Sequence, residues 1–97
     1  MSYYLTPEAD TELTEAVAFY AERLSLTVAR NFLRKFEATA ELLAEFPGLG
    51  TPTTQGRQLF PIGRYPYSML YRAEPGGVRI SAIAHHSRRP RYWEQRP

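Results

Sequence analysis

The sequence contains no cysteine, only one lysine and one tryptophan, and no long apolar run among its 97 residues. Without cysteine, disulfide bonds and thiolate metal sites are excluded, which fits a reducing compartment. No segment approaches the ~20 apolar residues needed to cross a bilayer, and residues 1–5 lack the basic start of a signal peptide. We therefore expect a cytoplasmic protein with no membrane partner.

Several catalytic signatures are also missing. His85 and His86 are adjacent at the end of a predicted strand, so with strand geometry their side chains should point to opposite faces and cannot jointly hold one metal ion. The sequence has no Gly-x-Ser-x-Gly motif, and no glycine-rich phosphate loop precedes a predicted helix. We therefore expect no metal site, no cofactor and no catalytic nucleophile.

The basic residues, 11 arginines and one lysine, are unevenly distributed. Residues 1–48 carry four basic and eight acidic side chains, whereas residues 49–97 carry eight arginines and two glutamates. Arginine binds carboxylates and phosphates through two parallel hydrogen bonds and stacks on aromatic rings. A solvated arginine-rich face would explain the number of arginines but not this separation, so the second half indicates an anionic partner.

Two amphipathic helices are predicted in the first half. Thr6 is an N-cap followed by proline, and an apolar stripe at helical spacing extends from there to about Arg23. A second stripe begins after a corner where Ser25 or Thr27 is the cap, and it ends at residues 46–48, where a proline and a glycine stop the helix. Four glutamates lie off the first stripe and are expected on a solvated face: Glu8, Glu12, Glu15 and Glu22.

The second half predicts a small sheet. Residues 57–62 form a short strand that contains a proline, and residues 67–74 and 78–85 alternate in polarity on either side of a Pro-Gly-Gly turn. Residues 3–5 favour a further strand, and residues 49–55 a surface loop. The following side chains should share the face that packs on the helices: Tyr67, Met69, Tyr71, Ala73, Val78, Ile80, Ala82 and Ala84.

The whole chain, residues 1–97, is thus predicted to be a single α+β domain with the order β-α-α-β-β-β. The helical hairpin should pack on one face of a small, mainly antiparallel sheet. The opposite face and the segment after the last strand should carry the basic residues. We expect one surface for a negatively charged partner, formed by Arg57, Arg64, Arg72, Arg79, His85, Arg88, Arg89, Arg91, Tyr92 and Trp93.

Composition does not choose between two anionic partners for this surface, because arginine beside aromatic residues suits both a phosphodiester backbone and an acidic protein. Tyr92 and Trp93 have an alternative role, in which the tail folds back and they close the edge of the core. A ribonuclease is a further alternative, with arginine stabilising the charged transition state and His85 or His86 moving protons.

Nearly the whole chain resembles the ParE/RelE toxin superfamily of type II toxin-antitoxin systems. The resemblance rests on the residue order Phe46-Pro47-Gly48, Leu59-Phe60-Pro61, Arg64-x-x-Tyr67-x-x-x-Tyr71-Arg72 and Ala84-His85-x-x-Arg88-x-Pro90-x-Tyr92-Trp93. The last of these motifs is similar to the ParE branch. The resemblance implies the fold predicted above, a cognate antitoxin whose C-terminal segment wraps around the toxin, and inhibition of DNA gyrase that blocks replication.

The RelE branch instead implies cleavage of mRNA on the ribosome. Members of that branch typically carry lysines on the strand before the central hairpin, an arginine early in the next strand, and an arginine and a tyrosine near the C-terminus. An ungapped alignment places other residues of this sequence there: Leu59, Pro61, Ser68, Ser87 and Trp93. The mRNA endonuclease therefore stays the alternative, and a family member that only binds its partner is a third possibility.

Overall fold

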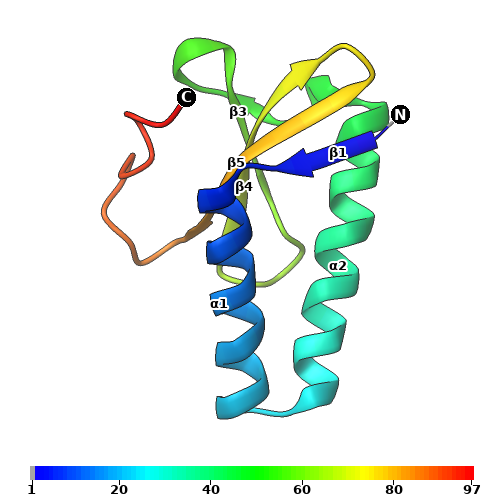
Figure 1. Cartoon of the computed structure of the whole chain (residues 1–97), viewed down its shortest axis with the longest axis vertical. Helices are drawn as coiled ribbons and strands as arrows, with labels where there is room; N and C mark the ends of the chain where they lie inside the picture. The colour runs from blue at the N-terminus through cyan, green and yellow to red at the C-terminus, as the bar shows by residue number, and fades with distance from the viewer. Residues whose placement is uncertain (1) are drawn as a thin grey trace.

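A computed structural model describes residues 2–97, and Met1 lies outside the described residues. Two helices pack on one face of a five-stranded mixed sheet, as predicted (Figure 1). The helices are α1, Pro7–Arg23, and α2, Leu26–Glu45. The strands are β1, Ser2–Leu5, β2, Thr51–Pro52, β3, Gln58–Pro61, β4, Tyr67–Glu74, and β5, Gly77–His85. Single 3₁₀ turns lie at η1, Pro47–Leu49, and η2, Thr54–Gly56.

The helix boundaries follow the capping residues in the sequence. The hydroxyl of Thr6 accepts a hydrogen bond from the amide of Ala9 at 3.3 Å, and that of Ser25 accepts one from Val28 at 3.1 Å. Ser25, rather than Thr27, is therefore the cap of α2. Within residues 2–97, neither helix combines the length and the apolar character that a membrane span requires.

The sheet order is β1-β5-β4-β3-β2, and only β1 runs parallel to its neighbour, β5. The close approach of β1 requires glycine at position 77, since a Cβ there would lie 1.7 Å from the carbonyl oxygen of Ser2. The short strand β2 and the two 3₁₀ turns lie where the sequence predicted an irregular loop. Pairing of β2 with β3 extends the sheet beyond the four predicted strands.

The predicted alternation in β5 is wrong after Ile80. In the ladder with β4, Tyr71 lies opposite Ile80 while Leu70 lies opposite Ala82, so Ser81 is an extra residue that forms a β-bulge. The bulge reverses the facing of the following residues: Ile83 packs in the core beneath the helices, whereas Ala82 and Ala84 pack on the other face. An alternating pattern cannot reveal an inserted residue when the residues after it are also apolar.

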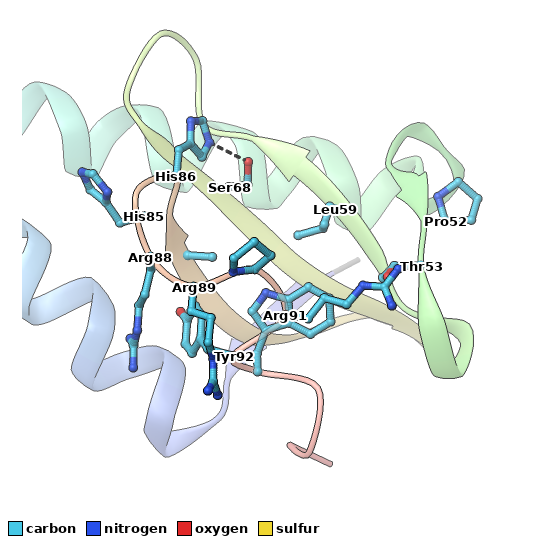
Figure 2. Close-up of a pocket in the computed structure, with 13 residues that line it drawn as sticks. Pro52, Thr53, Leu59, Ser68, His85, His86, Arg88, Arg89, Arg91 and Tyr92 are labelled. Atoms are coloured by element: carbon cyan, nitrogen blue, oxygen red, sulfur yellow. Dashed lines mark hydrogen bonds between the residues drawn. The ribbon is translucent and has the colours of Figure 1, made fainter.

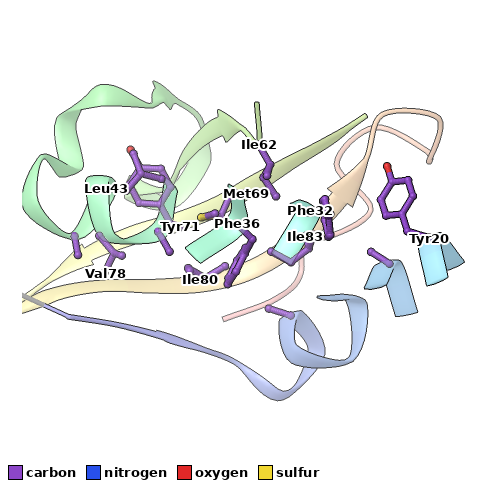
Figure 3. Packing of buried hydrophobic residues seen from close by; sticks show 14 of the residues in the cluster. Tyr20, Phe32, Phe36, Leu43, Ile62, Met69, Tyr71, Val78, Ile80 and Ile83 are labelled. Carbon is purple, nitrogen blue, oxygen red and sulfur yellow. The ribbon is translucent and has the colours of Figure 1, made fainter. Parts of the chain in front are cut away.

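The main core lies between the helices and the sheet (Figure 3). Phe32 and Phe36 of α2 are buried there against Met69, Ile80 and other sheet residues. Tyr71 is also fully buried in this core. Its hydroxyl donates a hydrogen bond to the carbonyl of Pro47 at 2.7 Å and accepts one from the amide of Gly50 at 2.9 Å, which ties the end of α2 to the sheet.

Candidate functional site

The C-terminal tail, residues 86–97, lies beside the sheet on the side away from α2 (Figure 1). Its single tryptophan, Trp93, is only 4% exposed and packs with Leu70, Ala82 and Ala84 in a second apolar cluster. The tail therefore folds over part of the sheet face that was predicted to carry basic residues, and an apolar cluster lies there instead. Trp93 closes the edge of the core, which was the alternative role for this residue.

Glu12 of α1 binds the tail through its carboxylate. This residue is 9% exposed, so the prediction that it lies on a solvated helix face is wrong. Its carboxylate accepts hydrogen bonds from Arg88 at 3.0 Å, from the Tyr92 hydroxyl at 2.7 Å, and from Arg96 at 2.9 and 3.1 Å. We call these four residues the Glu12 cluster. Both carboxylate oxygens are used, and the contacts join the first helix to the tail.

The Glu12 cluster also completes an edge of the sheet. Strand β1 ends at Leu5, so the last residues of β5 have no strand beside them on that edge. There, Glu12 accepts a hydrogen bond from the amide of Ile83 at 3.0 Å, and Arg96 donates one to the carbonyl of Ser81 at 3.1 Å. Buried backbone groups need such partners, which explains why charged side chains lie at this position.

The charge state of the cluster follows from its contacts. Burial alone would raise the pKa of Glu12, but the hydrogen bonds from Arg96, Tyr92 and Ile83 together lower that pKa below its ordinary value. Burial, followed by the hydrogen bond to Glu12, raises the pKa of the Tyr92 hydroxyl. At neutral pH, Glu12 is therefore an ionised acceptor and Tyr92 a neutral donor.

Arg57 holds the tail from the other side. It is fully buried, so its predicted place on an exposed surface is wrong. Its guanidinium donates hydrogen bonds to the carbonyl of Glu94 at 3.1 Å and to that of Arg96 at 2.8 Å, and it lies 5.3 Å from the centre of the Trp93 ring. Burial lowers the pKa of Arg57. The Arg57 guanidinium also donates a hydrogen bond to the carbonyl of Thr54 at 3.4 Å, so it joins the loop before β3 to the tail.

Three of the other predicted arginines lie outside the tail. Arg72 donates a hydrogen bond to the carbonyl of Gln55 at 2.8 Å, and Arg79 lies 3.6 Å from the carboxylate of Glu74. Arg64 borders a separate pocket beside α2, where Lys35 is the second cation. These three are not among the residues that line the groove beside the tail.

A groove of about 360 Å³ lies between the tail and the sheet, and we call it the tail groove (Figure 2). Six of the ten predicted site residues line it: His85, Arg88, Arg89, Arg91, Tyr92 and Trp93. The remaining lining residues are Pro52, Thr53, Leu59, Ser68, Ala84, His86 and Pro90, so the lining has three arginines and two histidines but no aspartate or glutamate. The groove is therefore a positively charged hollow with an apolar floor.

The two histidines point to different sides, as their adjacency predicted (Figure 2). His85 packs edge-on against Tyr67, with 4.9 Å between ring centres, while the Nε2 atom of His86 lies 3.0 Å from the hydroxyl oxygen of Ser68. Within residues 2–97, no three histidine, aspartate or glutamate residues are grouped so as to hold a metal ion.

The family assignment rests on most of the chain. Residues 3–90 match the family model described as the ParE toxin of the type II toxin-antitoxin system parDE. The chain belongs to the ParE toxin family. A ParE toxin is one component of a toxin-antitoxin pair, which implies an antitoxin partner for this family member.

The fold of this ParE toxin is similar to that of a solved chain described as the chromosomal ParDE TA system from P. aeruginosa. The TM-score is 0.74, with 20% sequence identity over 88% of this chain and 95% of that chain. A search of curated proteins gave no match. The ParE family match ends at residue 90, so four of the tail residues that contact Glu12 or Arg57 lie beyond it: Tyr92, Trp93, Glu94 and Arg96.

Proposed function

We propose that this ParE toxin inhibits DNA gyrase and thereby blocks replication, and that a cognate antitoxin with an acidic segment neutralises it in the cytoplasm. The observation that carries the proposal is the match of residues 3–90 to the ParE toxin family. The ParE-like ending from His85 to Trp93 supports the same branch. The mode of action that we propose is binding to the target rather than covalent chemistry.

The tail groove supports a negatively charged partner. Arg89 and Arg91 are exposed at its rim, and Arg88 keeps a side chain that is 52% exposed even though it contacts Glu12. A concave surface with cations and no carboxylate concentrates positive potential, which speeds the encounter with an acidic partner and fixes its orientation. Arg91 is also paired only loosely, at 3.9 Å from Glu94, so a partner carboxylate can replace that contact.

One observation favours the alternative, an mRNA endonuclease. Ser68 and His86 lie within hydrogen-bonding distance in the tail groove, beside arginines that could stabilise a charged phosphate. Two positions argue against it. Leu59 and Trp93, which take the places of catalytic residues in the RelE branch, pack in an apolar cluster and have no group that can transfer a proton to or from an RNA phosphate.

Two assays of the purified toxin distinguish the two activities, one with DNA gyrase and one with ribosome-bound mRNA. We expect it to inhibit supercoiling by gyrase, or to trap cleaved DNA, while ribosome-bound mRNA stays intact. Arg89→Ala should weaken the inhibition, whereas Arg30→Ala, which removes the same charge from an exposed position on α2, should not. Cleavage of mRNA in the ribosomal A site without any effect on gyrase would reverse the assignment.

A further inference from the structure

The C-terminal tail is fixed to the protein mainly by side chains. Among residues 89–97, the backbone hydrogen bonds are local turns, such as Tyr92 to Arg89 at 3.3 Å and Glu94 to Arg91 at 2.9 Å. None of these backbone bonds joins that segment to a strand or helix in the described part of the chain. Arg91 also has a φ of 59°, which an arginine rarely adopts without support from its surroundings. The conformation of the tail therefore depends on the groups that hold it.

Besides the packing of Trp93 on the sheet, two charged side chains hold the tail, and they act on different parts of it. Arg57 binds backbone carbonyls at residues 94 and 96, whereas Glu12 binds the side chains of Arg88, Tyr92 and Arg96. The contacts of Glu12 thus lie on both sides of the segment 89–91. That segment carries the exposed cations of the tail groove.

Glu12 itself is not part of the groove lining. Figure 2 shows Arg88 directed toward α1, the helix that carries Glu12, rather than into the open space. Arg88 and Arg96 further enclose the Tyr92 ring, with their guanidinium carbons 3.6 and 5.1 Å from its centre. A single buried carboxylate therefore sets the positions of three tail side chains at once.

From this geometry we infer that Glu12 is a positioning residue for target binding, because it holds the tail in the one conformation that presents Arg89 and Arg91 along the tail groove. This inference rests on the proposed function, since the target is taken to be gyrase. It gives a residue of the first helix an indirect role in a surface that the second half of the chain forms. Glu12 does not touch the target and acts only through the tail.

The test compares Glu12→Gln with Glu15→Gln, which removes the same charge from an exposed position on the same helix. Glutamine keeps the size of the side chain but turns an amide donor toward three other donors. We expect Glu12→Gln to weaken gyrase inhibition by about tenfold or more. The reason is that the free-energy cost of leaving the buried partners of a carboxylate unpaired is larger than the free energy that corresponds to a tenfold change. Glu15→Gln should inhibit like the wild type.

The position of the tail is read separately through Trp93, the single tryptophan of the chain. Because Trp93 is buried where the folded tail packs on the sheet, acrylamide should quench its fluorescence poorly in the wild type and in Glu15→Gln. In Glu12→Gln the quenching should rise, while the far-ultraviolet circular dichroism of the helices is retained. Unchanged quenching would overturn the inference, whatever the target is.

A double-mutant cycle with Arg89→Ala distinguishes positioning from a general loss of structure. If Glu12 acts by placing Arg89, the Arg89→Ala change should cost little further inhibition in the Glu12→Gln background. Additive losses would overturn the inference, and so would full inhibition by Glu12→Gln. If Glu12→Gln does not fold, Arg96→Gln replaces it. That change removes the hydrogen bonds that the Arg96 guanidinium donates to Glu12 and to Ser81, none of which lies in the groove lining, and it leaves Arg88, Tyr92 and Ile83 bound to Glu12.

Failure of the proposed function gives a different result. If the wild type does not inhibit gyrase, the target assignment is wrong, and the same cycle is then scored by growth arrest on expression without the antitoxin. Loss of arrest in Glu12→Gln, with raised Trp93 quenching and no further loss from Arg89→Ala, would still support the positioning role. Arrest at the wild-type level in Glu12→Gln would contradict it.

Discussion

Replacing Glu12 by alanine should destabilise the protein more than any other substitution of an acidic residue on α1. The change leaves the buried amide of Ile83 without its acceptor and removes the shared partner of Arg88, Tyr92 and Arg96. Breaking a buried ion pair by deleting one partner costs about 3–5 kcal/mol. Here the cost is reduced, because the Arg88 side chain is 52% exposed and can regain water.

We therefore expect a loss of about 2–4 kcal/mol in the free energy of unfolding for Glu12→Ala. A surface change such as Glu15→Ala should stay within about 0.5 kcal/mol of the wild type. Urea unfolding measures both, with circular dichroism following the helices and Trp93 fluorescence following the tail. In Glu12→Ala the urea midpoint should fall for both signals. The fluorescence of Trp93 should change at the same urea concentration as the circular dichroism of the helices, or at a lower one. A midpoint equal to that of Glu15→Ala would refute the role assigned to the cluster.

Three further predictions concern stability. Tyr71→Phe removes the hydroxyl that binds the buried amide of Gly50, so it should cost about 1–3 kcal/mol in urea unfolding. Ser25→Ala removes the N-cap of α2 and should cost about 1 kcal/mol, whereas Thr27→Ala, two residues further along in the first turn, should cost clearly less. The pKa of Glu12 is lower in the folded than in the unfolded protein. Its contribution to the free energy of unfolding is therefore complete above the unfolded pKa near 4.5, and it is lost as pH falls through the folded pKa. Glu12→Gln should therefore show a smaller loss of stability on acidification than Glu15→Gln.

The order of elements could be predicted because local signals and the fold agree. Thr6 and Ser25 mark the beginnings of the helices, and proline at position 47 marks the end of the second. The hairpin of β4 and β5 follows from alternation around a glycine-rich turn. The bulge at Ser81 could not be predicted, since it depends on how β5 meets its neighbours rather than on its own composition.

The role of Glu12 was hidden by its charge, although its position was visible in the sequence. Glu12 follows Ala9 by three residues and precedes Ala16 by four, so helical spacing places it on the buried face with them. Treating every glutamate as solvated hides this signal. A buried position for an acidic residue, in a chain with many arginines in its second half, indicates an internal ion pair.

The arginines could be predicted as a group but not assigned individually. Arg57 looks like its neighbours in the sequence, yet it is fully buried, because the tail returns over the sheet and supplies backbone carbonyls. Arg96 and Arg88 bind the chain's own carboxylate, while Arg89 lines the tail groove. Only the folded chain separates arginines that anchor the tail from those that remain available to a partner.

We propose that the tail groove is the surface that docks on gyrase. Amide hydrogen exchange of the wild-type toxin, measured alone and with gyrase, is the decisive experiment. Gyrase should slow exchange in residues 85–93 and in Thr53 beside them, with little change on the exposed face of α2. Protection confined to α2, with exchange in residues 85–93 unaltered by gyrase, would contradict it.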